Sequence, residues 1–237
     1  MPWTIPTVIP LPRDFKGFDP LSSMPSGDFS TYARHLPHWR LPGAAYFITF
    51  RLNDSIPSAI LAEMQRDAES WRQRLADHAR PMFESERTQW QEFQRARLRK
   101  LERLLDENHG ECLLREARHR QVVADALHHF EGQRCEMLSY VVMPNHVHAL
   151  CRLLGDYRME DLCHSWKGFT AQRIQRSIGR KGPLWQDESF DRIIRDGTHY
   201  QACVRYIAKN PLKAKLQAHE ASTWFCQSIL EANQRPA

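Results

Sequence analysis

Two strand-like runs joined by the residues Met-Pro-Asn constrain the fold of this chain more than any other feature. The first run is Cys135–Val142 and the second is His146–Leu153. Both are rich in β-branched and other apolar residues, and Pro and Asn are residues that favour turns. The pattern therefore predicts two neighbouring antiparallel strands, connected as a β-hairpin.

The order of the other elements predicts the rest of the sheet. When residues 57–107 are set aside, the first six elements read strand, helix, strand, strand, helix, strand, which is the split-βαβ plan. We therefore expect an α+β fold with a ferredoxin-like antiparallel sheet and packed helices. The elements outside the hairpin are a first strand Ala44–Leu52, a helix Glu116–Phe130, a helix Met159–Ile178, a short strand Ser189–Asp196 and a last helix Thr198–Lys209.

The segment 57–107 is predicted to be an inserted antiparallel helical hairpin with helices at 57–79 and 84–107. Apolar residues recur there at helical spacing, and the outer faces are dense in Arg and Glu, which suits either a solvated face or a surface for a partner. The two stripes are Leu61, Met64, Ala68, Trp71 and Leu75, and Trp90, Phe93, Leu98, Leu101 and Leu105.

The remaining segments complete the predicted organisation of the chain. Residues 1–43 are rich in proline and predict an extended N-terminal arm on the surface. Residues 44–56 and 108–216 form the main domain, and residues 217–237 form a C-terminal tail. The sequence contains no internal repeat, and no glycine-rich phosphate loop follows a predicted strand.

Composition narrows the classes of function. The formal net charge of +5 and the pI near 9.0 favour polyanionic partners mildly. The six cysteines are scattered without a Cys-x-x-Cys pair, which predicts reduced cysteines and neither a zinc knuckle nor a disulfide framework. The N-terminus lacks the pattern of a signal peptide, and no window approaches the ~20 apolar residues of a membrane span. We therefore expect a soluble cytoplasmic protein without a membrane partner.

His146 and His148 stand one residue apart on the second predicted strand. Residues two apart on a strand point to the same face, so the two imidazoles project together and Val147 faces the other way. Two adjacent neutral imidazoles suit a divalent metal ion. The spacing is short, however, and fits a pair of surface histidines equally well.

The last predicted helix carries a second candidate group. Tyr206 is out of phase with the apolar stripe and shares a face with Asn210 one turn later, with His199 behind them. Pro211 is expected to end the helix and to leave the Asn210 side-chain oxygen free to coordinate. Taken alone, this pair also fits an exposed tyrosine beside a helix cap. The apolar stripe consists of Tyr200, Cys203, Val204, Ile207 and Ala208.

Four segments taken together resemble a known family. They are VVMPNHVHAL, HSWKGFTAQRI, LWQDESFDRIIRD and YIAKNPLKAKL, in that order. The chain resembles the REP-associated tyrosine transposases, which belong to the HUH single-strand DNA transposases and nucleases, from about Gly110 to Leu216. The combination of Met-Pro-Asn-His-x-His with Tyr-Ile-x-x-Asn-Pro is far more specific than either motif alone.

The resemblance implies a ferredoxin-like sheet, metal ligands at His146, His148 and Asn210, and a nucleophile at Tyr206. It also implies an enzyme that cleaves single-stranded DNA, with REP-type hairpin DNA as its substrate, and that becomes joined to the 5′-phosphate. Mg²⁺ or Mn²⁺ suits such ligands, and zinc is less favoured because no third His or Cys stands at ligand spacing. We expect a bacterial protein associated with the nucleoid, as a monomer or a homodimer.

Three alternatives stay open beside this interpretation. One is a metal-dependent hydrolase without a covalent intermediate, for which Tyr206 would be dispensable. Another is a non-catalytic DNA-binding descendant of the same fold, which the intact set of Tyr, His-x-His and Asn argues against. A third is a relaxase or replication initiator, which the short chain makes less favourable.

Contacts with DNA are predicted on the helix Met159–Ile178 and just beyond it. Basic residues there would follow the phosphates. Trp166 and Phe169 would either stack on unpaired bases or pack in the core of an amphipathic helix. The basic residues are Lys167, Arg173, Arg176, Arg180 and Lys181.

Overall fold

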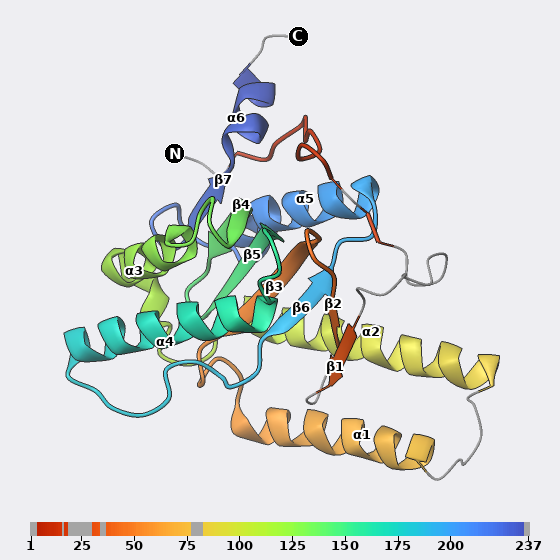
Figure 1. Cartoon of the computed structure of the whole chain (residues 1–237). Coiled ribbons are helices and arrows are strands. Elements are labelled where there is room, and N and C mark those ends of the chain that lie inside the picture. The colour runs from red at the N-terminus through yellow and green to blue at the C-terminus, as the bar shows by residue number, and fades with distance from the viewer. Residues whose placement is uncertain (1–3, 16, 19–29, 34–36, 77–82, 235–237) are drawn as a thin grey trace.

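The centre of the molecule is a five-stranded antiparallel sheet (Figure 1). The computed structural model describes residues 4–15, 17–18, 30–33, 37–76 and 83–234. Within these residues the strands of the main sheet lie in the order β6-β3-β5-β4-β7. The strands are β3 (Ala45–Arg51), β4 (Cys135–Val142), β5 (His146–Leu153), β6 (Phe190–Ile193) and β7 (Ser222–Phe225).

The topology confirms the predicted split-βαβ, ferredoxin-like fold. Helix α3 (Ala117–His128) precedes β4, and helix α4 (Met159–Ile178) connects β5 to β6. Across the sheet the order of these four strands is β6, β3, β5, β4. Numbered by their order of appearance in this sheet along the chain, they are the fourth, first, third and second strands. A short 3₁₀ turn, Leu113–Arg115, leads into α3.

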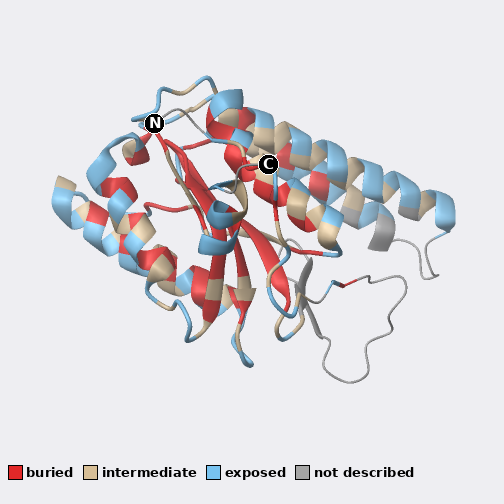
Figure 2. Ribbon diagram, turned by 90° about the horizontal axis from the view of Figure 1, so that it is seen from above, coloured by how far each residue is buried: buried red, intermediate tan, exposed pale blue. Residues whose placement is uncertain are grey.

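Helices cover both faces of the sheet. Alternate strand residues divide between two apolar clusters, so Val147 packs with Trp166 beneath α3 and α4, whereas Leu150 packs with Val204 beneath helix α5 (Gly197–Lys213). Figure 2 shows the resulting arrangement, in which the buried strands lie between helices with exposed outer faces. The two faces of the sheet therefore lie in different environments. The face under α5 carries the paired histidines.

The strand β7 was not predicted, because it lies in the segment taken as a C-terminal tail. It pairs with β4 from Ser139↔Phe225 to Val142↔Ser222, and Trp224 stacks on Tyr140 with ring centroids 5.6 Å apart. Helix α6 (Gln227–Gln234) follows, and its Asn233 side chain donates to the carbonyl of Val8 at 2.7 Å. A strand of four residues is too short for its alternation to be recognised in a sequence.

The predicted N-terminal arm contains a short antiparallel pair, β1 (Ser30–Ala33) with β2 (Pro37–Arg40). Ile9 and Phe18 are buried against the domain. At Gly17 an added Cβ would lie 2.3 Å from the carbonyl oxygen of Arg195, so only glycine allows this close approach. Residues 1–3, 16, 19–29 and 34–36 of the predicted arm lie outside the described part of the chain.

The inserted segment forms the two predicted helices, α1 (Ser58–Ala76) and α2 (Glu84–Asp106). Its own apolar cluster joins Met64 of α1 to Leu104 and Leu105 of α2, and Trp71 lies 5.3 Å from Phe93 between ring centroids. The Leu75 side chain and residues 77–82 lie outside the described residues. None of the helices in the described ranges is long and apolar enough to span a membrane.

We expect the main domain to fold without the inserted hairpin. The hairpin cluster is separate from the two clusters on the sheet, and an ion pair between Asp106 and Lys213 at 2.7 Å joins α2 to α5. A partly exposed pair of this kind contributes about 0–1 kcal/mol. Replacement of residues 57–107 by a short linker should therefore preserve one cooperative thermal transition in circular dichroism. Loss of that transition would place the hairpin within the main core.

Candidate active site

The two histidines lie side by side on β5, as the strand pattern predicted. His148 is opposite Thr49 and His146 is opposite Arg51 on β3. Their Nε2 atoms are 3.1 Å apart, and the residues are only 0% (His146) and 2% (His148) exposed. The alternative of two surface histidines is therefore wrong. Imidazoles buried in this way need polar partners.

His146 has a partner that determines its tautomer. Its Nδ1 lies 2.7 Å from Oδ1 of Asn145, and Nδ2 of Asn145 donates to the carbonyl of His109 at 3.1 Å. Because the amide nitrogen is used towards His109, its oxygen must accept the proton of His146 Nδ1. The Nε2 atom of His146 then presents a lone pair towards His148.

His148 is held in a similar way from the neighbouring strand. Its Nδ1 lies 2.7 Å from the Thr49 hydroxyl, and its ring stacks on Phe47 with centroids 5.3 Å apart. Burial lowers the pKa of His146 to about 3, with a smaller effect of Lys213. Burial first, and then His146, lowers the pKa of His148 well below its usual value. Both rings are therefore neutral near pH 7, which is the form that binds metals.

Asn145 and Thr49, which orient the two rings, were not among the residues predicted for the site. Asn145 belongs to the Met-Pro-Asn turn and was read only as a turn residue. Thr49 belongs to the first predicted strand, and only the register of β3 on β5 shows that it lies opposite His148. Partners of this kind orient a ligand and raise its basicity.

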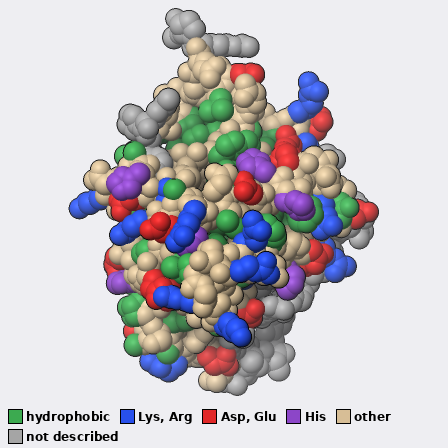
Figure 3. Space-filling view, turned by 90° about the vertical axis from the view of Figure 1, so that its left-hand side faces the viewer, with side chains coloured by type: hydrophobic (Ala, Val, Ile, Leu, Met, Phe, Trp, Pro, Cys, Tyr) green, Lys and Arg blue, Asp and Glu red, His purple; other side chains and the backbone are tan. Residues whose placement is uncertain are grey.

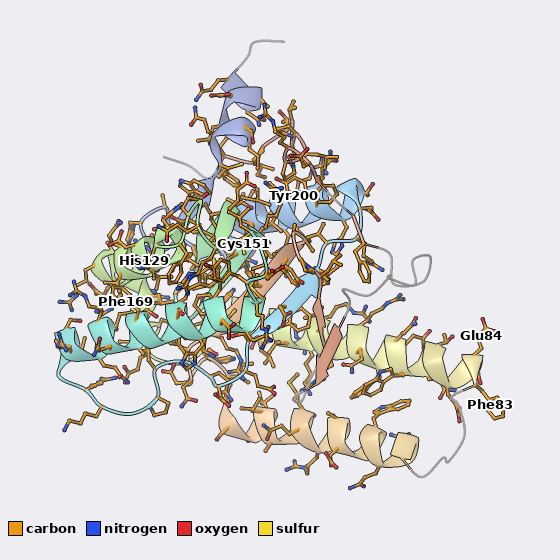
Figure 4. The ribbon with its side chains drawn as sticks, viewed as in Figure 1. Phe83, Glu84, His129, Cys151, Phe169 and Tyr200 are labelled. Carbon is orange, nitrogen blue, oxygen red and sulfur yellow. The ribbon has the colours of Figure 1, made fainter. Side chains whose placement is uncertain are left out.

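Tyr206 reaches the histidines from α5. Its Oη atom is 3.5 Å from Nε2 of His148, and its ring packs edge-on against His148 at 5.1 Å between centroids. Tyr200, labelled in Figure 4, is 1% exposed and belongs to the apolar cluster beneath the helix. Helical phase therefore separated the two tyrosines correctly. His199 instead lies at the start of α5, where its Nδ1 accepts from the backbone N–H of Arg195 at 3.1 Å.

Asn210 is 1% exposed, and within the described residues neither its Oδ1 nor its Nδ2 has a hydrogen bond of standard geometry. An unsatisfied buried amide group costs about 1–3 kcal/mol. The helix does not end at Pro211 as predicted, because α5 continues to Lys213. Proline removes one backbone donor, whereas Ala214 N–H still donates to the Asn210 carbonyl at 3.0 Å and the Pro211 ring is buried.

The inserted hairpin borders Tyr206, which the sequence did not indicate. Burial raises the pKa of the Tyr206 phenol, and Glu102 and Asp106 of α2 raise it further, whereas the nearby Asn210 amide lowers it by less. Lys213 connects the two elements, since its Nζ is 2.7 Å from Asp106 and 6.0 Å from the centroid of the Tyr206 ring. The environment built by the protein alone thus opposes ionisation of Tyr206.

The residues present fit a divalent cation. Two imidazole Nε2 atoms converge at 3.1 Å, and the buried amide of Asn210 lies one turn beyond Tyr206 without a partner of standard geometry. No group of three or more His, Cys, Asp or Glu side chains that could hold a metal occurs in the described residues. A set of two ring nitrogens and one amide oxygen would leave positions open for other oxygen ligands.

The predicted DNA-binding cations lie away from this site. Helix α4 covers the opposite face of the sheet, where Trp166 is buried and Phe169 is 48% exposed (Figure 4). Lys167 donates to the carbonyl of Asp187 at 2.6 Å, and Arg180 pairs with Glu111. Figure 3 shows Lys and Arg side chains, interspersed with acidic ones, on the side of the molecule where α4 ends. Arg173, Arg176 and Lys181 are exposed. Binding of DNA by the five basic residues stays a prediction.

The part of the chain that carries this site also matches a family model. Residues 111–210 match the family model described as Transposase IS200 like. Residues 111–210 are therefore similar to IS200-like transposases. The matched range contains both histidines, Tyr206 and Asn210, and it begins after the inserted hairpin.

Among solved structures, the chain is similar to a REP-associated tyrosine transposase bound to a REP hairpin, at 18% identity and a TM-score of 0.40. The similarity covers 78% of this chain and 73% of that one. No curated protein matches the chain at a significant level.

Proposed function

We propose that this chain is an IS200-like transposase of the REP-associated tyrosine type and that it cleaves single-stranded DNA with Tyr206 as its nucleophile. The observation that carries the proposal is the position of the Tyr206 hydroxyl, 3.5 Å from Nε2 of a buried histidine in a converging pair. The four polar side chains brought together at this point are those of the motif combination that resembles the family.

In this proposal His146, His148 and Asn210 hold Mg²⁺ or Mn²⁺ through two ring nitrogens and one amide oxygen. When bound, the cation would polarise the scissile phosphate and favour the ionised phenol, which the protein environment alone disfavours. Asn145 and Thr49 keep the two rings in place, with Nδ1 of each ring engaged at 2.7 Å. The buried setting excludes competing water from the ring nitrogens.

The covalent step uses one atom of this chain. Oη of Tyr206 attacks the phosphorus, the O–P bond forms, and the phenol proton leaves to solvent. The bond from phosphorus to the 3′ oxygen breaks, and that oxygen takes up a proton to become a free 3′-hydroxyl. The phosphotyrosine conserves the energy of the phosphodiester, so strands can be rejoined without a nucleotide cofactor.

A direct experiment incubates the protein and Mg²⁺ with labelled single-stranded DNA from the flanks of its gene. We expect a labelled protein–DNA adduct that survives a denaturing gel. Cleaved DNA without an adduct would indicate a hydrolase that acts without a covalent intermediate. Intact DNA that is nevertheless bound would indicate a non-catalytic descendant of the fold.

We further expect selectivity for single strands over duplexes. The histidine pair is buried beneath Tyr206 and beside the hairpin, so a flexible strand can bring a phosphate to it more readily than a rigid duplex can. Binding should weaken steeply with salt, since neutralised phosphates release counterions. The test measures cleavage of one DNA sequence in three forms: as a single strand, as a self-folded hairpin and as a perfect duplex. Equal cutting of the duplex would refute it.

A further inference from the structure

A cavity of about 660 Å³ lies between the inserted hairpin and the main sheet. Its lining comes from β3, from both hairpin helices and from the segment 186–190, which leads into β6. Cavities of about 300–1,000 Å³ are typical of sites for small organic groups. The cavity exists only because the hairpin is present, since α1 and α2 provide most of its walls.

The cavity adjoins the catalytic site directly. Thr49 lines it and also contacts Nδ1 of His148 at 2.7 Å. Arg51 lines it as well and is opposite His146 in the register of β3 and β5. The Thr49 side chain therefore links the cavity to His148, and the nucleotide next to a phosphate at Tyr206 is the candidate to enter it.

The lining has the chemistry of a base-binding site. One wall is apolar, with Leu61 and Met64 of α1 facing Leu98 and Leu101 of α2. The lining includes charged residues of both signs, such as Arg66 and Glu69. A lining of mixed charge suits a bare phosphate less well than a group that has both hydrogen-bond donors and acceptors. Carboxamides pair with the edges of unpaired bases, and the cavity has three, from Gln65, Gln94 and Gln186.

Arg51 gives the cavity a positive charge at its inner end. The residue is 8% exposed, and its Nη1 donates to the neutral hydroxyl of Ser55 at 3.1 Å. Its backbone carbonyl accepts from the N–H of Gln186 at 2.9 Å, which ties the segment 186–190 to β3. Because Arg51 is opposite His146 in the strand register, we expect its guanidinium to approach the phosphate that links the bound base to the scissile position.

We propose that this cavity receives one unpaired base of the DNA strand, next to the scissile phosphate. The inserted hairpin is then part of the substrate-binding site, and its apolar seam holds the base while the amides contact its edge. This inference rests on the proposed function, because single-stranded DNA is the ligand. It assigns to the insertion a role in binding the strand that the family match, which begins at residue 111, does not include.

The test fills the cavity with an indole. Gln94→Trp on α2 and Gln65→Trp on α1 are compared with Gln91→Trp, an exposed position on α2 outside the lining. Binding is measured by fluorescence anisotropy with labelled oligothymidine and with an abasic strand of the same length. Circular dichroism melting of each variant verifies that it is folded, and Gln65→Trp, at an exposed rim position, serves if Gln94→Trp does not fold.

We expect Gln94→Trp and Gln65→Trp to weaken binding of oligothymidine by about tenfold, which is the size expected for loss of one bound base. Binding of the abasic strand should change by less than about twofold, and Gln91→Trp should match the wild type on both strands. Unchanged affinity of the folded cavity variants for oligothymidine would overturn the proposal. Equal weakening for both strands would also overturn it, since that would indicate a blocked phosphate path.

The result of this binding test can be distinguished from the result of the cleavage test for the proposed function. Adduct formation at Tyr206 is measured in a denaturing gel, whereas binding of a base in the cavity is measured as equilibrium affinity, without cleavage. If adducts form and the folded cavity variants bind oligothymidine normally, the transposase chemistry stands and the base pocket falls. If no adduct forms but binding depends on the cavity and on the bases, the pocket stands without the chemistry.

Discussion

Tyr206→Phe should abolish the covalent DNA adduct while leaving the protein folded. The substitution removes one oxygen, whose nearest ring nitrogen is 3.5 Å away on His148, and keeps the ring that packs on Phe47 and His148. The free energy of unfolding should therefore change by about 1 kcal/mol at most. The measurements are a denaturing gel with labelled single-stranded DNA and a denaturant titration of the same variant.

Tyr200 provides the matched control on the same helix. Tyr200→Phe should retain the adduct, because its ring is buried in the apolar cluster away from the histidines. Tyr200→Ala should lower the free energy of unfolding by about 3–5 kcal/mol, the range for truncation of a buried aromatic ring. An adduct that survives in Tyr206→Phe and is lost in Tyr200→Phe would overturn the assignment of the nucleophile.

The second large effect concerns the metal. His148→Ala should eliminate cleavage, because it removes one of the two nitrogens that converge at 3.1 Å. A chelator should eliminate cleavage by the wild type, and added Mn²⁺ or Mg²⁺ should restore it. His164→Ala, at an exposed histidine on α4, is the matched control and should retain cleavage.

Two results would count against this site. Full cleavage in the presence of chelator would remove the metal from the mechanism. Cleavage by His148→Ala at the Mn²⁺ concentration that suffices for the wild type, with unchanged Mn²⁺ affinity, would show that the ring is not a ligand. Affinity can be read independently of cleavage by calorimetric titration of Mn²⁺ into the folded variant.

The sheet was predictable because its long strands carry strong local signals. Cys135–Val142 and His146–Leu153 were found at their observed bounds, and the order of elements implied the ferredoxin-like topology that the structure confirms. β7 was missed because it becomes a strand only by pairing with β4. The end of α5 was misplaced because the local preference of Pro211 was overridden by tertiary packing.

The candidate site was predictable only in part. Period-2 spacing placed His146 and His148 on one face, and helical spacing brought Tyr206 and Asn210 together. The partners of the rings, Thr49 and Asn145, depend on strand register and turn geometry, which spacing does not reveal. The approach of Glu102 and Asp106 to Tyr206 depends on how the hairpin docks, and periodicity within a helix carries no information about docking.

The most direct measurement of the central claim is peptide mapping of the covalent adduct. After reaction with single-stranded DNA and nuclease trimming, trypsin should release Tyr206–Lys209 as a peptide that lies between Arg205 and Asn210. Tyr200 lies in the separate peptide Asp196–Arg205, so the two tyrosines are distinguished by mass. We expect a nucleotide on the Tyr206 peptide alone. A nucleotide on the Tyr200 peptide, or DNA cleaved with neither peptide modified, would contradict it.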